Sequence, residues 1–128
     1  MSLLLDTHAF LWWLDGDPQL SLRARVAIAE PATQVFVSAA SAWEITAKAR
    51  KGKLPGATAV AADVLVAIRS QRFSPLDISV EDAQRSGALT GDHADPFDRM
   101  LIAQALRRGL GLVSNERLFD EYGVERIW

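Results

Sequence analysis

The sequence predicts an α/β domain in which strands of a parallel sheet alternate with helices along the chain. Three short segments rich in branched apolar residues have the composition of buried parallel strands: Leu3–Leu5, Val35–Val37 and Leu112–Val113. Longer stretches between them carry apolar residues at helical spacing. The chain has 128 residues, of which 49% are apolar and 23% charged, enough for one hydrophobic core. We therefore expect a single domain spanning residues 1–128.

In the first half of the chain, the apolar spacing predicts three helices around the first two strands. These helices are expected at Thr7–Leu14, Ser21–Ala29 and Ala40–Arg50. The sequences Asp-Gly-Asp-Pro, Glu-Pro and Gly-Lys-Leu-Pro-Gly mark the breaks that follow them, because such residues favour turns.

The second half is expected to hold three more helices, the strand Leu112–Val113 and two additional short strands. The helices are predicted at Ala59–Arg69, Val80–Leu89 and Phe97–Arg108, and the additional strands at Leu76–Ile78 and Glu125–Ile127. The last helix has the clearest apolar face, and Gly109 is a natural stop for it. A Ser-Pro sequence is expected to break the chain before the Leu76–Ile78 strand.

Four acidic residues, Asp6, Glu44, Asp98 and Glu116, each stand at or near the first turn of an expected helix. If their segments lie side by side around a parallel sheet, the four carboxylates converge at the edge where such sheets bind ligands. Magnesium and manganese ions prefer oxygen ligands of this kind. The chain has no cysteine, so any metal must be held by oxygen or imidazole. The sequence therefore predicts a divalent-metal site.

Each acid also has a purely structural explanation, including Glu116, which comes two residues after Ser114. Asp6 is placed to cap a helix, and Glu44 follows a serine by three residues, as in a capping box. Asp98 complements a helix dipole if Asp95 is the cap before Pro96, which we favour over a metal-binding role for Asp95. Capping explains the acids one at a time, but it gives no reason for all of them to lie at one end of the sheet.

The net charge of −2 argues mildly against a nucleic-acid partner unless basic residues cluster locally. Such a cluster occurs at the end of the helix that carries Glu44: Lys48, Arg50, Lys51 and Lys53. These cations either complement the helix C-terminus, with Lys48 paired to Glu44, or contact a phosphate backbone. Lys51 and Lys53 are the candidates for phosphate contact.

The location of the protein is expected to be cytoplasmic. The apolar N-terminus lacks a basic leading region and is interrupted by Asp6, unlike a signal peptide. No apolar run approaches the roughly 18 residues of a membrane span. The absence of cysteine is compatible with a reducing compartment.

Motifs along most of the chain can be compared with known families: LLLDTHAFLWWL, SAASAWEITAKARKGKL, HADPFDRMLIAQA and LVSNERLFDEYGVERIW. In this order and spacing they resemble the PIN-domain family, and specifically the VapC-type toxins of bacterial toxin–antitoxin pairs. The resemblance extends from Leu3 to Trp128, and the run Asp95–Arg99 is its most specific part. It implies a PIN-like fold, with a short parallel sheet of about four to five strands flanked by helices on both faces.

The resemblance also implies an endoribonuclease dependent on Mg²⁺ or Mn²⁺ that hydrolyses RNA phosphodiester bonds. Asp6 and Asp98 would be the principal metal ligands, and Glu44 would complete their set. The family usually has an aspartate at the fourth position, two residues after a threonine or serine, whereas this chain has Glu116 after Ser114. Because glutamate is one carbon longer, Glu116 is expected to act through water or with a shifted metal preference.

The partners implied by the resemblance are an RNA substrate, a VapB-type antitoxin lying across the active-site groove, and a second copy of the chain in a homodimer. Trp12 and Trp13 cannot both face the core squarely from one helix, so one of them is expected at an interface. Arg99 is expected to contact a phosphate or to pair with Asp95. His8 and His93 flank the acids but are too few for a histidine metal site.

Two alternative functions are open at this point. One is a catalytically impaired PIN-like interaction domain, which the unusual Glu116 favours. The other is a metal-dependent phosphohydrolase of another class, such as a haloacid-dehalogenase type. That class requires a second aspartate two residues after Asp6, where this chain has His8.

Overall fold

A five-stranded, wholly parallel sheet forms the centre of the computed structural model, which describes residues 1–128. The strands lie in the order β3-β2-β1-β4-β5. Their bounds are β1 Ser2–Leu5, β2 Gln34–Ser38, β3 Ser74–Leu76, β4 Gly111–Val113 and β5 Arg126–Ile127. The chain extends the sheet from β1 in one direction through β2 and β3, then returns to the other side of β1 with β4. The winding therefore reverses between β1 and β4, the kind of position where open parallel sheets bind ligands at their carboxyl ends.

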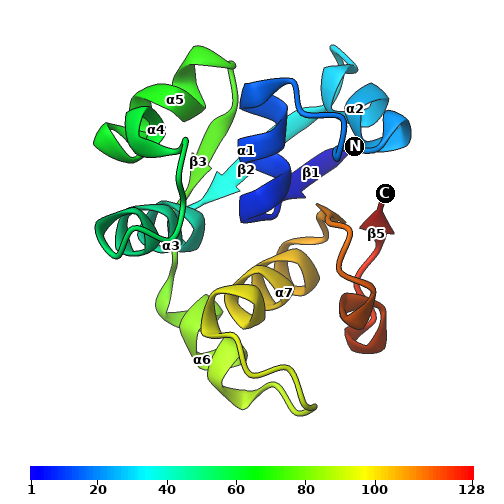
Figure 1. Ribbon diagram of the computed structural model, residues 1–128. Helices are drawn as coiled ribbons and strands as arrows, with labels where there is room; N and C mark the ends of the chain where they lie inside the picture. Colours follow the sequence, from blue (N-terminus) through cyan, green and yellow to red (C-terminus); the bar gives the residue numbers. More distant parts are fainter.

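Helices cover both faces of this sheet (Figure 1). They are α1 Thr7–Asp15, α2 Leu22–Ala29, α3 Ala39–Arg50, α4 Thr58–Ala62, α5 Val64–Ser70, α6 Val80–Ala88 and α7 Pro96–Arg108, with a 3-10 helix, η1, at Arg117–Tyr122. The predicted α/β class with flanking helices is confirmed. None of the helices combines the length and the apolar character needed to span a bilayer.

The core has two layers because successive residues of β1 point to opposite faces of the sheet. Leu3 and Leu5 pack with Phe10 of α1 in one apolar cluster, to which α2 and α5 also contribute. Leu4 packs with Leu101 of α7 in the other, which Phe119 of η1 completes. All three leucines of β1 are fully buried. A buried leucine contributes about 1.5–3 kcal/mol, so the central strand is firmly held beneath the residues that follow it.

The predicted helix Ala59–Arg69 is wrong in one respect, because it is broken into α4 and α5 at Asp63. The backbone of Asp63 is extended, with φ −158° and ψ 88°, and its carboxylate accepts a hydrogen bond from the N–H of Val66 at 3.1 Å. An aspartate that caps the next helix competes with continuation of the previous one. The helical spacing of the apolar residues continues through this break, so spacing alone did not reveal it.

The predicted strand Leu76–Ile78 is also shifted, because β3 occupies Ser74–Leu76 and includes Pro75. β3 is an edge strand paired only with β2. A proline is tolerated there, since an edge strand needs hydrogen bonds on one side only. The Ser-Pro sequence taken for a break is therefore the beginning of the strand. The expected strand at the C-terminus is confirmed as Arg126–Ile127.

Candidate active site

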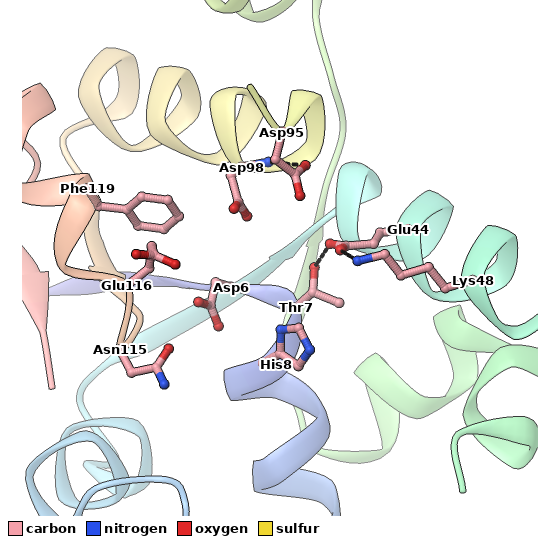
Figure 2. A pocket seen from close by; sticks show the side chains of 10 residues that line it. All are labelled: Asp6, Thr7, His8, Glu44, Lys48, Asp95, Asp98, Asn115, Glu116 and Phe119. Carbon is pink, nitrogen blue, oxygen red and sulfur yellow. Dashed lines mark hydrogen bonds and ion pairs between the residues drawn. The ribbon is translucent and has the colours of Figure 1, made fainter. Parts of the chain in front are cut away.

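One pocket at the carboxyl edge of the sheet is lined by all four predicted acids, Asp6, Glu44, Asp98 and Glu116 (Figure 2). Asp6 directly follows β1, and Glu116 follows β4, the neighbouring strand. Glu44 comes from the second turn of α3, and Asp98 from the first turn of α7. The remaining lining residues are Thr7, His8, Lys48, Asp95, Asn115 and Phe119. Segments remote in sequence thus bring five carboxylates to one place.

Asp6 caps α1 and faces the pocket at the same time. Its Oδ1 accepts a hydrogen bond from the N–H of Ala9 at 2.7 Å, and the residue is 7% exposed. Burial raises the pKa of Asp6 to about 6, although hydrogen bonds from Ser114 and Ala9 oppose the shift and the charges of Glu44 and Glu116 add to it. Asp6 therefore serves both as a helix cap and as a residue of the pocket.

Glu44 is buried within α3, and the structure excludes the capping explanation for it. The cap of α3 is Ser38, whose Oγ accepts from the N–H of Ala40 at 3.0 Å, so the predicted capping box with Ser41 is wrong. The hydroxyl of Thr7 instead donates to Oε1 of Glu44 at 2.6 Å and lies 2.9 Å from Oγ of Ser41. Capping of α3 therefore does not explain why residue 44 is acidic.

The other oxygen of Glu44 forms an ion pair with Lys48, one turn later on α3. This ion pair is one of the two roles that the sequence suggested for Lys48. Burial lowers the pKa of Lys48, but the hydrogen bond and charge of Glu44 outweigh that effect, with Asp95 and Asp98 adding to it, so the net shift is upward. Lys48 is therefore an ammonium ion beside the acids.

Asp98 is held by His93, a residue that was not expected from the sequence to belong to the site. Nε2 of His93 lies 2.8 Å from Oδ2 of Asp98. Burial raises the pKa of Asp98 to about 6; the hydrogen bond from His93 opposes the shift, and the charges of Asp95 and Glu44 add to it. Only the position of His93 beside the Asp95–Arg99 motif pointed to it in the sequence. A loop contact of this kind depends on tertiary packing.

Asp95 is the cap of α7, as predicted. Its Oδ1 accepts from the N–H groups of Phe97 at 2.9 Å and Asp98 at 3.3 Å, with Pro96 in the first turn. The predicted ion pair between Asp95 and Arg99 is wrong. The guanidinium of Arg99 donates to the backbone oxygen of His93 at 2.9 Å and to that of Leu89. A phosphate contact by Arg99 stays a prediction.

Glu116 stands exposed at the mouth of the pocket. Its N–H donates to Oγ of Ser114 at 3.0 Å, but its own side chain does not cap η1. Phe119 of η1, which is fully buried, forms the apolar wall nearby. Lys51 and Lys53 lie exposed beyond the end of α3, outside the pocket, so their predicted contact with RNA stays a prediction.

Trp12, Trp13 and Trp128 pack against the core, and the expected interface position of one tryptophan stays a prediction. Trp12 packs on Trp128 at 5.9 Å between ring centroids, and Trp13 packs on Phe73 at the same distance. Both residues of the pair therefore have aromatic partners within the chain. Trp43 also has an aromatic partner, Phe97, at 5.0 Å between ring centroids, but the residue is 63% exposed.

The residues of the pocket fit a hard divalent cation, because most of their polar groups are carboxylates, which such ions prefer as ligands. Burial raises the pKa values of two of them, Asp6 and Asp98, and a bound cation would favour their ionised forms. In the arrangement described, however, no three acidic or histidine side chains are close enough to hold an ion. Asp6, Glu44 and Asp98 are each hydrogen-bonded to a protein donor instead. Metal binding would require at least some of these bonds to be exchanged.

The strand order, the helices on both faces and the acidic pocket define an α/β protein of the PIN type. The sequence matches the PIN domain family over residues 3–125, and the chain belongs to this family. It is also similar to Ribonuclease VapC22 of Mycobacterium tuberculosis, with 31% identity over 119 residues. That similarity covers 91% of this chain and 88% of the relative.

Solved structures of similar fold include three toxin–antitoxin complexes. VapBC2 of Rickettsia felis, bound to a promoter DNA fragment, matches with a TM-score of 0.72 and 16% identity, covering 100% of both chains. VapBC-1 of nontypeable Haemophilus influenzae matches with 0.68 and 16%, covering 98% of this chain and 96% of that one. A toxin–antitoxin complex of Klebsiella pneumoniae matches with 0.61 and 23%, covering 89% and 86%. At these identities the matches establish the fold.

Proposed function

We propose that this PIN-domain protein is a ribonuclease that uses bound Mg²⁺ or Mn²⁺ to hydrolyse RNA phosphodiester bonds, as the toxin of a toxin–antitoxin pair. The observation that carries the proposal is the gathering of Asp6, Glu44, Asp98 and Glu116 in one pocket. The similarity to a curated ribonuclease over most of the chain supports the same conclusion.

The four acids would divide the binding of the cation among them. Asp6 and Asp98 are the principal ligands, because both are buried enough for their pKa values to rise to about 6, and a cation would relieve that strain. Glu44 completes the set. Glu116, which is exposed and one carbon longer than an aspartate, supports a second ion or an outer water molecule.

When bound, a divalent ion would supply the Lewis acidity that activates water and stabilises the charge developing on the phosphate oxygens. The chain itself orients the carboxylates. The Thr7 hydroxyl fixes Glu44, and His93 fixes Asp98. Phe119 closes the inner wall against bulk water. Water is the nucleophile in this scheme, so no serine or histidine nucleophile is required.

RNA, an antitoxin of the VapB type and a second copy of this chain are the partners that we propose, in the cytoplasm. The antitoxin is supported by the structural neighbours, which are VapBC complexes. Lys51 and Lys53 would contact the RNA backbone beyond the pocket. Leu22 and Val26, exposed one turn apart on α2, offer apolar surface to a protein partner.

The test is cleavage of total RNA by the purified protein with and without Mg²⁺ or Mn²⁺, beside an Asp98→Asn variant. Cleavage only with a divalent ion, and at least about a hundredfold less by the variant, is expected, because an electrostatic contact to the transition state is lost. Equal cleavage by the variant would show that the site is elsewhere. Failure of both proteins to cleave, with retained binding of an antitoxin, would favour the interaction domain.

A further inference from the structure

Lys48 is the only lysine or arginine among the residues that line the acidic pocket (Figure 2). The carboxylates of the same pocket are those of Asp6, Glu44, Asp95, Asp98 and Glu116. A phosphodiester is negatively charged, so such a surface repels it unless cations offset the repulsion. Lys48 is therefore the one permanent positive charge of this chain that is placed to meet a phosphate inside the pocket.

In this structure the Lys48 ammonium is bound to Glu44. It pairs with Oε2, while the hydroxyl of Thr7 donates to Oε1 at 2.6 Å. Figure 2 shows these three side chains together beside the α3 helix. Any divalent ion that bound Glu44 through Oε2 would have to compete with Lys48 for that oxygen, because both are cations.

The side chain of Lys48 can change partners more easily than that of Glu44. The Lys48 side chain is 33% exposed, whereas that of Glu44 is 4% exposed and is also fixed by Thr7. The flexible four-carbon stem of a lysine lets its ammonium reach different oxygens from one backbone position. A divalent ion that took the place of Lys48 would leave the buried Glu44 carboxylate still paired with a cation.

We propose that Lys48 has two partners in turn. In the metal-free protein it neutralises Glu44, and in the substrate complex, with a divalent ion on Glu44, it contacts the scissile phosphate of the RNA. The inference rests on the proposed ribonuclease function. It makes Lys48 a catalytic residue and assigns to the α3 helix both a metal ligand and the phosphate contact one turn away.

The first test measures Mn²⁺ binding by calorimetry in the absence of RNA. The parent protein is compared with Lys48→Met and with Arg69→Met, a control that removes one exposed positive charge on α5. Lys48→Met is expected to bind Mn²⁺ at least about twofold more tightly than both, because a competing ion pair is lost. Equal or weaker binding would overturn the proposal, because Lys48 would then not compete for Glu44.

The second test measures RNA cleavage by the same proteins at saturating Mn²⁺, after their melting temperatures have shown that they are folded. Lys48→Met is expected to lose about tenfold or more in kcat/KM, since a charged contact to the transition state is removed. Lys48→Arg should recover part of this loss. Tighter Mn²⁺ binding together with slower cleavage is a pattern that a purely structural lysine would not produce.

Two outcomes separate this inference from the ribonuclease proposal on which it rests. If Lys48→Met cleaves RNA as fast as Arg69→Met does, the phosphate contact is wrong while the ribonuclease proposal stands. If the parent protein cleaves no RNA with any divalent ion, the ribonuclease proposal fails and takes the phosphate contact with it. The calorimetric comparison would still decide whether Lys48 competes for Glu44.

Discussion

The hydroxyl of Thr7 donates a hydrogen bond of 2.6 Å to Oε1 of Glu44, and so connects the start of α1 with the second turn of α3. Thr7 is the residue after Asp6, and both are buried. The backbone at the start of α1 therefore places Asp6 in the pocket, while the next residue, Thr7, fixes the orientation of Glu44. The Asp-Thr sequence after β1 thus acts on two of the four candidate ligands.

Replacing Thr7 with valine is expected to slow RNA cleavage by about tenfold while the fold is kept. The substitution removes the hydrogen bond to Glu44, and leaving the buried partner groups unpaired costs about 1–3 kcal/mol. Cleavage rates and urea unfolding measure the two effects. The control is Thr46→Val on the same helix, whose hydroxyl bonds only to carbonyls of α3, at 2.8 and 3.1 Å. Similar losses in both variants would contradict a specific role for Thr7.

The metal-free protein is expected to become more stable as the pH falls from 7 towards 5. The folded-state pKa values of Asp6 and Asp98 are raised to about 6, above the ordinary 3.8, so protonation favours the folded state in the window between these values. Above pH 6 that contribution is lost. Denaturant unfolding at several pH values measures the trend.

Saturating Mg²⁺ is expected to abolish this trend or reverse it, because the ion binds the ionised carboxylates of the folded state only. In Asp6→Asn the metal-free trend should shrink, since one of the two shifted groups is gone. A stability that falls steadily from pH 7 to pH 5 without metal would contradict the raised pKa values of Asp6 and Asp98.

Asp82 is expected to be the acid on which stability depends most outside the pocket. It is fully buried on α6, and its carboxylate receives Nε of Arg107 at 2.6 Å and a guanidinium nitrogen of Arg108 at 2.9 Å. Burial raises the pKa of Asp82, but hydrogen bonds from Arg108, the Ser79 N–H, Arg107 and Gln104 outweigh it and hold the pKa well below its usual range.

The Asp82→Asn variant should therefore lose about 3 kcal/mol or more at pH 7 and keep its cleavage rate under conditions where it is folded. Because the pKa of Asp82 is lowered, its stabilisation is present above pH 3.8 and is lost as the pH falls below that value. The control is Glu81→Gln, which alters an exposed partner of Arg107 and should cost almost nothing. Unfolding curves at pH 7 and pH 3 test both statements.

Gly91 is expected to tolerate no side chain, unlike Gly87 on α6. Gly91 has φ +102°, and a Cβ there would lie 2.6 Å from the hydroxyl oxygen of Tyr122. That hydroxyl accepts a hydrogen bond from the N–H of His93 at 3.1 Å, so Gly91→Ala should disturb the residue that holds Asp98. Loss of both melting temperature and cleavage is expected.

The matched Gly87→Ala change meets no atom within 4 Å. It should stabilise the protein by about 0.5–1 kcal/mol, because alanine is the better helix former. Equal effects of the two substitutions would contradict the strain assigned to Gly91.

Local sequence was sufficient to predict four of the five strands and most of the helices, because these segments have a recognisable apolar pattern and are bounded by capping or turn residues. Asp63 and Pro75 mark where such reasoning failed. Whether an aspartate interrupts a helix, and whether a proline can lie in a strand, depends on which segments pack beside it in the folded chain.

The residues of the site were likewise predicted only in part. Asp6, Glu44 and Asp98 stand at places that motif and topology identify together, but the side chains that orient them were not foreseen. His93 reaches Asp98 from a loop, and Thr7 reaches Glu44 across two helices. No spacing rule connects residues that are 37 positions apart, as Thr7 and Glu44 are.

The central claim, that carboxylates from remote segments hold one cation, is tested most directly by the anomalous scattering of Mn²⁺ in crystals of the protein. A peak is expected in the pocket within about 2.4 Å of oxygens from both Asp6 and Asp98. Lys48 should have moved away from Glu44, leaving Oε2 of Glu44 to the ion. A peak elsewhere on the surface, or none in the pocket at millimolar Mn²⁺ with Asp6 and Asp98 still bonded as they are here, would contradict the account.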